Sequence, residues 1–525
     1  MGKRLSAKAV KSLLSETGEI GFFDVREYGQ YGAAHPFFVI PLAYSVFELR
    51  LPALAPRQSA PLVLMDDGDG IADRAAARAE ALGYGDVSVL DGGAPAWAAA
   101  GYTLYEGVNV PSKTFGELLE LARHTPRLSA REVAALKTDG TDHVIVDGRP
   151  FGEYQKMNIP GGVCCPNGEL ALRIGEIAPD PQTTIVVNCA GRTRSILGAQ
   201  TLIDFGIPNP VFALENGTQG WFLADLELEN GADRRMDRLS PGDLDARQAA
   251  ARALATRNGV PLVLPQEVEA WVQDPGTTTY LLDVRSAEEF AADGKPGTTH
   301  APGGQLVQAT DQWVGVRNAQ IVLLDSDGVR APVTANWLRQ MGHNAVVLEG
   351  GVAAAGSLHL PDRQAEPKLL PTVPEMSVES LKQAMSAGAP HILDLRSGMT
   401  HRAGHVAGAR WCLRPQISNV AAEPDHPVVL LSDDAGKAAL FAQDLAERGV
   451  TDISRLAGNI EAWRAGGLSL ATSETPSDAA CIDYLFFTHD RHAGNRAAAE
   501  RYIEWELGLV DQLDTQERAV FRMPS

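Results

Sequence analysis

One short segment combines a cysteine with two arginines in a pattern that favours nucleophilic chemistry. Cys189 follows the apolar run at 184–187 and opens the loop Cys189-Ala190-Gly191-Arg192-Thr193-Arg194-Ser195. A thiol reacts as its thiolate, which needs positive potential because the pKa of a free cysteine is about 8.5. Backbone N–H groups in the loop, a helix N-terminus near Ser195 and the two guanidinium groups would supply that potential. The segment predicts a reactive thiolate beside a cradle for an anion, with one of the two arginines free to face solvent instead.

The strand that leads to Cys189 belongs to a unit that occurs four times. Each unit has an apolar strand ending in Asp-x-Arg and a later apolar strand ending in a loop. The first marker falls at Asp24, Asp147, Asp283 and Asp394, and the second at Asp66, Cys189, Asp325 and Ser432. The two markers lie 42 residues apart in the first three units and 38 in the fourth. Such self-similarity indicates tandem domains.

The elements between the markers predict the fold class. Short apolar strands alternate with helical patterns that end in glycine, at residues 72–83, 195–206, 331–342 and 438–449. This alternation is typical of an α/β fold with a parallel sheet covered on both faces. A C-terminal stretch, 496–518, also has helical spacing, with Tyr502 and Trp505 on one face. We expect this tail to pack on the last domain; a partner-binding helix is the alternative.

The motifs together resemble those of the rhodanese, or thiosulfate sulfurtransferase, family. They are Asp-Val-Arg early in the unit, the turn Gly404-His405-Val406-Ala407-Gly408, the loop headed by Cys189, and Leu90-Asp91-Gly92-Gly93 followed by Trp97. The resemblance implies a five-stranded parallel sheet flanked by helices in each unit, and transfer of sulfane sulfur through a cysteine persulfide. We predict inactive rhodanese-like domains at 1–105, 262–360 and 374–470, a catalytic one at 126–230, and a helical tail at 471–525.

Loop length favours sulfur transfer over phosphate chemistry. Cys189 would take sulfur from thiosulfate or a related persulfide donor and pass it to cyanide or a thiol, which is covalent catalysis. Cys189 and Arg194 form Cys-x4-Arg, whereas related phosphatases and arsenate reductases have Cys-x5-Arg, a larger loop that fits a tetrahedral oxyanion. Two alternatives stay open: a persulfide relay or scaffold with low turnover, and a Cys-dependent phosphatase or arsenate reductase.

Four further residues near this loop are candidates for a functional role, and a fifth departs from the family pattern. Arg173 and Arg149 are candidates for the pocket wall, although Arg149 belongs to the Asp-x-Arg pair of every unit, which favours a structural role. Cys164 and Cys165 are interpreted as packing residues, with a resolving thiol for Cys189 as the alternative. Asn158 stands where the family has a turn histidine.

The other three units lack the nucleophile. Asp66, Asp325 and Ser432 occupy the position of Cys189, and their loops carry two or three carboxylates each. We expect these loops to repel an anion and the domains to act as walls or scaffold; which of them covers Cys189 stays open.

Composition limits the partners. The net charge of −20 and the pI of about 5.1 argue against nucleic acid. Lys8 and Lys11 interrupt the N-terminal stretch of a would-be export signal, no apolar run suggests a membrane span, and five cysteines fit a reducing compartment, so we expect a cytoplasmic protein. No cofactor or metal site is predicted: His401 with His405, and His489 with His492, lack further ligands. The expected partners are a small anionic sulfur donor, a thiol or cyanide acceptor and a protein sulfur donor or acceptor; the oligomeric state stays open.

Overall fold

The computed structural model describes residues 3–236, 238, 240, 242–360, 370–388, 390–420, 426–491 and 494–523. The chain divides into two compact units. One unit comprises Met1–Leu14, Ile20–Gly107 and Gln364–Phe486, and the other Ser15–Glu19, Val108–Arg363 and Phe487–Ser525. The second and third domains belong to the same unit, and the first and fourth to the other. Residues 361–369, between the third and fourth domains, fall outside the described residues, as does His492.

The domain that contains Cys189 is built on a parallel sheet with the strand order β6-β10-β9-β7-β8. The strands are β6 (Arg127–Leu128), β7 (His143–Asp147), β8 (Val163–Cys164), β9 (Thr184–Asn188) and β10 (Val211–Leu214). The helices are α6 (Val110–Arg123), α7 (Ala130–Thr138), α8 (Phe151–Lys156), η2 (Asn167–Glu169), α9 (Leu170–Ile177), α10 (Thr193–Phe205) and α11 (Gly217–Leu223).

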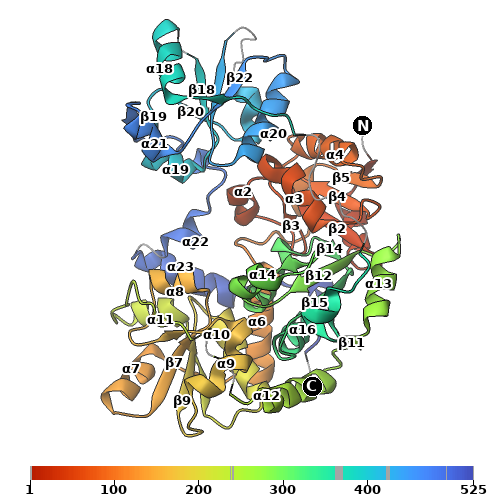
Figure 1. Cartoon of the computed structure of the whole chain (residues 1–525), viewed down its shortest axis with the longest axis vertical. Helices are drawn as coiled ribbons and strands as arrows, with labels where there is room; N and C mark the ends of the chain where they lie inside the picture. The colour runs from red at the N-terminus through yellow and green to blue at the C-terminus, as the bar shows by residue number, and fades with distance from the viewer. Residues whose placement is uncertain are drawn as a thin grey trace. The chain divides into compact units, whose positions relative to one another are not determined.

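Both faces of this sheet are covered, as the unbroken apolar strands predict. Ile185 and Val187 point to one face and pack among residues of α9 and α10. Val186, between them, points to the other face and packs with Val133 of α7 and Trp221 of α11. Figure 1 shows these helices on either side of β7 and β9. Because β9 is the middle strand in the order β6-β10-β9-β7-β8, its carboxyl end, and so Cys189, lies in the middle of the sheet edge.

The third domain repeats this order as β11-β16-β15-β12-β13. Its strands are β11 (Leu262–Val263), β12 (Thr279–Asp283), β13 (Thr299–His300), β15 (Gln320–Leu324) and β16 (Asn344–Leu348). Its helices are α13 (Pro265–Gln273), α14 (Ala287–Asp293), α15 (Gly303–Gln308), η3 (Thr310–Gln312), α16 (Arg330–Gln340) and α17 (Gly351–Ala355). The connecting helix α12 (Leu244–Arg257) buries Ala251 and Leu254 and packs on α16, so it is not the fully solvated linker that its charge suggests.

The first and fourth domains follow the same plan. The first pairs its strands in the order β1-β5-β4-β2-β3 and the fourth in the order β17-β22-β21-β18-β20. The strands are β1 (Lys3–Leu5), β2 (Ile20–Asp24), β3 (Ile40–Pro41), β4 (Leu62–Met65) and β5 (Val87–Leu90), then β17 (Glu375–Met376), β18 (His391–Asp394), β20 (Arg410–Trp411), β21 (Val428–Leu431) and β22 (Ile453–Leu456). The helices after the middle strands are α4 (Ile71–Ala81) and α20 (Ala435–Ala446).

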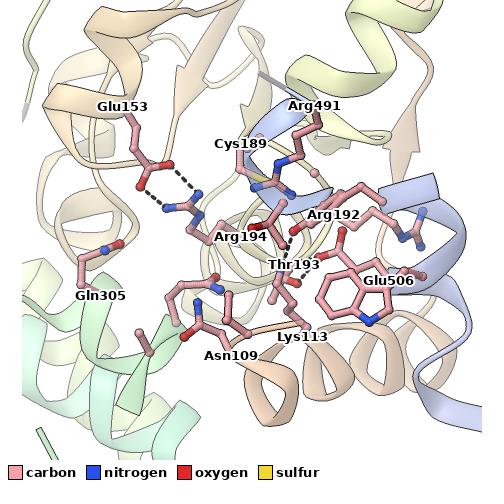
Figure 2. A pocket seen from close by; sticks show the side chains of 18 of the residues that line it. Asn109, Lys113, Glu153, Cys189, Arg192, Thr193, Arg194, Gln305, Arg491 and Glu506 are labelled. Carbon is pink, nitrogen blue, oxygen red and sulfur yellow. Dashed lines mark hydrogen bonds and ion pairs between the residues drawn. The ribbon is translucent and has the colours of Figure 1, made fainter. Parts of the chain in front are cut away.

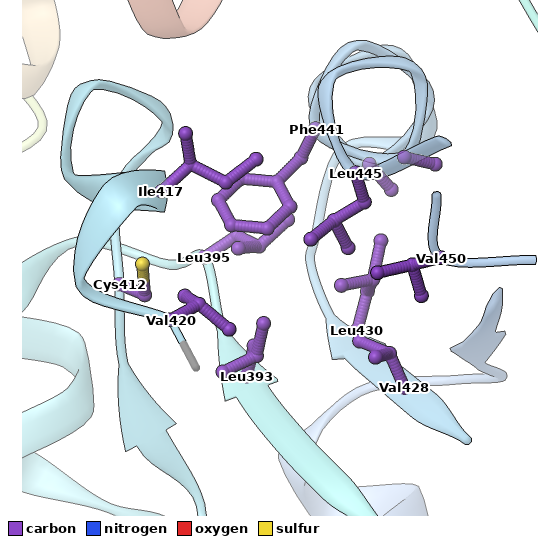
Figure 3. Packing of buried hydrophobic residues seen from close by; sticks show 12 residues of the cluster. Leu393, Leu395, Cys412, Ile417, Val420, Val428, Leu430, Phe441, Leu445 and Val450 are labelled. Atoms are coloured by element: carbon purple, nitrogen blue, oxygen red, sulfur yellow. The ribbon is translucent and has the colours of Figure 1, made fainter. Parts of the chain in front are cut away.

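The predicted α/β class with four parallel-sheet domains is confirmed. The core of the fourth domain shows how each is closed: Leu393 and Leu430 of the sheet pack under Phe441 and Leu445 of α20 (Figure 3). Cys412 lies in this cluster, and burial raises the pKa of its thiol to about 12. It is a core residue, as its sequence context suggests.

The C-terminal tail does not pack as predicted. Its helices include α22 (Phe486–Asp490), α23 (Arg496–Leu507), η6 (Val510–Gln512) and α24 (Thr515–Arg518). α23 packs against α6 and α11, in the unit that contains Cys189, and the tail from Phe487 onward belongs to that unit. The expected docking on the fourth domain is therefore wrong for this part of the tail. The physical reason is a polar match: Glu506 on the buried face of α23 is bonded by Lys113 and Thr193.

Candidate active site

Cys189 lies directly after β9, at the carboxyl end of the middle strand, where ligands bind in open α/β sheets. The residue is 2% exposed. Its Sγ lies 3.2 Å from Oγ of Ser195, whose hydroxyl is also 3.0 Å from the carbonyl oxygen of Arg192. Ser195 is therefore placed to donate a hydrogen bond to the sulfur once the thiol ionises.

The first glycine of α11 fixes the position of the loop. Gly217 follows Asn216, and both adopt positive φ, at 54° and 57°. A Cβ on Gly217 would lie 2.3 Å from the carbonyl oxygen of Cys189, closer than atoms approach. The first and third domains repeat this approach, with Gly93 against Asp66 and Gly351 against Asp325. The recurring glycine is thus required by the packing of α11, or its equivalent, on the loop.

Both arginines of the loop are ion-paired and partly or fully buried. Arg192 donates to Glu117 at 2.8 and 2.9 Å and also to Glu120. Arg194 donates to Glu153 at 2.9 and 2.8 Å (Figure 2). Neither turns to solvent, which is the alternative that the sequence left open. Their charge is largely neutralised by α6 and α8.

The carboxylates around Arg192 outnumber the guanidinium. Burial raises the pKa of Glu117 to about 7, the hydrogen bonds and charge of Arg192 offset part of this effect, and the charges of Glu506 and Glu120 add to it. Glu153 has Arg194 to itself. Burial opposes its ionisation, but the charge of Arg194 outweighs burial and lowers its pKa.

A cavity of about 190 Å³ opens beside Cys189, and five parts of the chain line it (Figure 2). The loop 189–194 forms its floor. The walls come from the start of α6, from α8, from α15 and η3 of the third domain, and from the tail. The third domain therefore covers Cys189, a point that the sequence leaves open. The wall residues with polar side chains are Asn109, Lys113, Glu153, Gln305, Gln308, Gln312, Thr488, Arg491, Tyr502 and Glu506.

The tail contributes a carboxylate that the sequence did not reveal. Glu506 Oε1 accepts hydrogen bonds from Lys113 Nζ at 3.0 Å and from Thr193 Oγ1 at 2.8 Å. Its Oε2 has no hydrogen-bond partner among the described residues and would lie 2.8 Å from a Cβ on Gly191. Burial opposes ionisation of Glu506, but Lys113 outweighs it and lowers the pKa. The helical face of Tyr502 and Trp505 is the one sequence signal that marks this wall.

Comparison with known proteins agrees with this architecture. A model of the rhodanese-like domain matches residues 6–100, 129–224, 264–356 and 377–466, each range inside one predicted domain. The chain belongs to the rhodanese family. The crystal structure of a thiosulfate sulfurtransferase from Pseudomonas aeruginosa is similar over 99% of each chain, with 39% identity and a TM-score of 0.89. A curated HTH-type transcriptional regulator from Mycobacterium tuberculosis is 35% identical over 88 residues; the match covers 17% of this chain and 38% of the regulator. Family membership and the full-length match identify a sulfurtransferase.

The three rhodanese domains without a cysteine at the head of this loop carry other groups at the position of Cys189. In the first, the carboxylate of Asp66 accepts backbone N–H bonds from Gly68, Gly70 and Ala72 at 2.8–3.0 Å. In the fourth, the Ser432 hydroxyl bonds with the backbone of Asp434. From its charge we expected the first loop to repel an anion. In the structure, the backbone N–H groups of this loop are already bonded to the loop's own carboxylate, Asp66.

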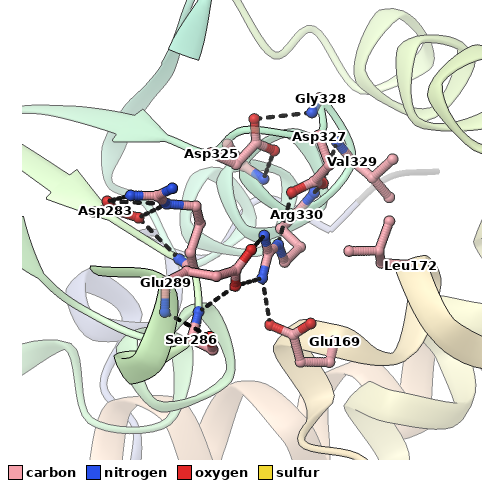
Figure 4. A network of polar contacts seen from close by, with 12 residues as sticks. Glu169, Leu172, Asp283, Ser286, Glu289, Asp325, Asp327, Gly328, Val329 and Arg330 are labelled. Atoms are coloured by element: carbon pink, nitrogen blue, oxygen red, sulfur yellow. Dashed lines mark hydrogen bonds and ion pairs between the residues drawn. The ribbon is translucent and has the colours of Figure 1, made fainter. Parts of the chain in front are cut away.

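The third domain is a close copy of the second, with Asp325 at the position of Cys189. Asp325 accepts N–H bonds from Gly328 at 3.0 Å and Ala331 at 2.8 Å. Five residues after it, Arg330 is bonded to Glu289, as Arg194 is to Glu153 in the second domain (Figure 4). The arginine–glutamate pair therefore persists where there is no thiol, which indicates that it shapes the loop.

The remaining sequence candidates lie outside the cavity lining. Arg149 is bonded to Asp147 at 2.7 Å and to the carbonyl oxygen of Met157, so it ties the strand end to the next turn. Arg173 donates to Glu169 at 3.3 Å. Cys164 and Cys165 are fully buried, the latter in the apolar core between the sheet and α10. These positions do not support a pocket role for the two arginines or a resolving role for the two thiols.

The turn position that departs from the family pattern keeps its hydrogen bond. Asn158 Nδ2 donates to the carbonyl oxygen of Tyr154 at 3.2 Å. In the fourth domain, Nδ1 of His405 makes the equivalent contact with the carbonyl oxygen of His401 at 2.8 Å. The amide thus replaces the imidazole in the same contact, four residues back along the chain.

The described residues contain neither a metal-binding cluster nor a membrane-spanning helix. In the ranges given above, no group of three or more His, Cys, Asp or Glu side chains is arranged to hold a metal ion. No helix of those ranges has the length and apolar character needed to cross a bilayer.

Proposed function

We propose that Cys189 carries the transferred sulfur as a persulfide, whose charge is held by backbone N–H groups of residues 190–195. The supporting observation is the carboxylate that takes the position of Cys189 in the first and third domains, Asp66 and Asp325. Oδ of an aspartate lies two bonds beyond Cβ, and so does the outer sulfur of a cysteine persulfide. In the first domain, that oxygen pair accepts N–H bonds from the residues two, four and six positions after Asp66. The equivalent residues after Cys189 are Gly191, Thr193 and Ser195.

The proposed reaction has two displacement steps. The Cys189 thiolate attacks the outer sulfur of the donor, a new S–S bond forms, and the donor's own bond to that sulfur breaks. With thiosulfate, sulfite leaves with the electron pair of that bond. Cyanide or an acceptor thiolate then attacks the outer sulfur of the persulfide, the S–S bond of the persulfide breaks, and the Cys189 thiolate is restored.

The cavity favours a small donor. Cys189 is 2% exposed, and the cavity of about 190 Å³ is closed by α6, the third domain and α23. Lys113, Arg194 and Arg491 in its lining favour an anion, although Glu153 and Glu506 limit the excess of positive charge. Thiosulfate and low-molecular-weight persulfides suit this arrangement better than a folded donor protein.

The test is mass spectrometry of the full chain after exposure to thiosulfate, glutathione persulfide or mercaptopyruvate in turn. A gain of one sulfur atom, about 32 Da, on the peptide with Cys189 is expected from the covalent mechanism. Peptides with the buried Cys164, Cys165 and Cys412 are internal controls. If Cys189→Ser keeps thiosulfate:cyanide activity, the proposal is wrong. Loading by protein persulfides alone would favour the relay, and hydrolysis of an aryl phosphate dependent on Cys189 would favour the phosphatase.

A further inference from the structure

A second cavity lies in the same unit as Cys189 and shares no lining residue with the first. Its volume is about 680 Å³, and Arg123, Arg257, Arg339 and Arg522 line it together with Asp204. The chain as a whole carries a net charge of −20. Four guanidinium groups around one cavity, with one carboxylate among them, are therefore a local reversal of the protein's charge.

The ends of four helices bring these side chains together. Arg123 is the last residue of α6, and Arg257 is the last residue of α12. Arg339 precedes the final residue of α16, and Asp204 precedes the final residue of α10. Arg522 follows α24, and its backbone N–H donates to the carbonyl oxygen of Gln340 at 2.8 Å. Because three of the arginines stand on helices that pack together, the cluster is held by the fold.

None of the four arginines forms an ion pair within the described part of the chain; the hydrogen bonds of their side chains go to backbone carbonyls. Arg257 donates to the carbonyl oxygen of Asp204 at 2.6 Å, and Arg339 to that of Ala345 at 3.3 Å. Nε of Arg123 is buried with no acceptor among the described residues. Each guanidinium offers five N–H donors, so most of the donors are unused by the protein.

Helix capping explains only part of this cluster. A helix C-terminus carries about half a negative charge, so an arginine there is favourable. Four such ends and Asp204 still leave the four guanidinium groups in excess. Burial lowers the pKa of Arg339, and the charge of Arg522 lowers it further, as expected for like charges that lack a counter-ion.

We propose that this cavity binds a multiply charged phosphate compound, either inorganic pyrophosphate or the phosphate chain of a nucleotide. Planar guanidinium groups bind phosphate oxygens through paired hydrogen bonds, which suits several arginines from separate helices better than it suits one. The cavity is larger than the one beside Cys189, and its volume accommodates more than a single tetrahedral anion. The site does not depend on the proposed role of Cys189.

The test is calorimetric titration of the full chain with pyrophosphate, ATP, citrate and sulfate. The binding variant is Arg257→Gln with Arg522→Gln, since both side chains are exposed and their loss leaves the core intact. Arg252→Gln is the matched control: it is an exposed arginine on α12 outside the cavity. Thermal unfolding of each variant checks that it is folded.

We expect saturable binding of pyrophosphate or ATP that weakens roughly tenfold or more for each arginine removed, since hydrogen bonds to charged groups are strong. Arg252→Gln and Cys189→Ser should bind as the wild type does. Binding of ATP without pyrophosphate identifies a nucleotide, and binding of both identifies the phosphate chain alone. The proposal is overturned if neither compound binds, if citrate and sulfate bind equally well, or if the double variant binds like the control.

Discussion

Replacing Glu117 by glutamine should change how the stability of the Cys189-containing unit depends on pH. Two carboxylates, Glu117 and Glu120, share the guanidinium of Arg192, and burial raises the pKa of Glu117 to about 7. In the unfolded chain this carboxyl has a pKa of about 4.5. The folded state therefore retains the proton between these two pH values, while the unfolded state has lost it.

The sign and size of the effect follow from this difference. A group whose folded pKa is raised contributes stability that is complete below its unfolded pKa and is lost as the pH rises through the folded pKa. At about 1.4 kcal/mol for each pH unit between 4.5 and 7, Glu117 accounts for a loss of about 3 kcal/mol. In Glu117→Gln this loss is absent, so the variant should gain about 3 kcal/mol relative to wild type between pH 4.5 and pH 8.

The assay is urea unfolding followed by tryptophan fluorescence at several pH values. Glu153→Gln is the matched control, since Glu153 pairs with the other loop arginine and its pKa is lowered. Because it retains Glu117, its stability relative to the wild type should show no step near pH 7. Thiosulfate loading gives a second measurement: above pH 7 the charge of Glu117 weakens attraction of the anion, so the ratio of Glu117→Gln to wild-type rates should rise through that pH. Parallel pH profiles for Glu117→Gln and wild type in both assays would refute the reasoning.

Two further substitutions test the loop and its wall. Gly217→Ala should slow sulfur loading of Cys189 in stopped-flow assays, because a Cβ would meet the Cys189 carbonyl oxygen at 2.3 Å and φ is +54°. The control, Gly93→Ala in the first domain, creates a similar clash at 2.2 Å and should leave loading of Cys189 unchanged. An equal effect of the two substitutions would contradict the role of Gly217. Glu506→Gln should lower KM for thiosulfate with little change in kcat, because it removes a negative charge beside the loop. The control is Glu504→Gln, which is exposed on the same helix. A higher KM for Glu506→Gln would count against the charge argument.

The carboxylates of the first and third domains give a physical reason to expect that duplication does not multiply activity. Asp66 and Asp325 place a fixed carboxylate where a transient persulfide charge would lie in the second domain. Burial raises the pKa of Asp325 to about 6, the neighbouring Asp327 raises it further, and N–H bonds from the loop oppose both. A cradle that already holds its own anion has no vacancy for a substrate, yet it preserves the loop that packs against the rest of the domain.

The sequence alone determined the repeated fold and singled out Cys189 as the candidate thiol. The 42-residue spacing between Asp147 and Cys189 recurs in two other units, because both markers stand at the ends of strands in the same sheet. Periodicity and loop motifs are local features, so they survive in a linear reading of the chain. For the same reason the sequence was sufficient to show that the other three loops lack a cysteine.

Only the tertiary structure decided what surrounds that thiol. Lys113 and Glu506 are 393 positions apart in the chain and 3.0 Å apart in space, and no local pattern couples them. The charges expected to attract an anion, Arg192 and Arg194, are instead shared with carboxylates of α6 and α8. The physical reason is that a buried charge needs a partner, and the partner comes from whichever element packing brings near. The sequence names the candidate nucleophile, and packing sets the charge and the walls of its pocket.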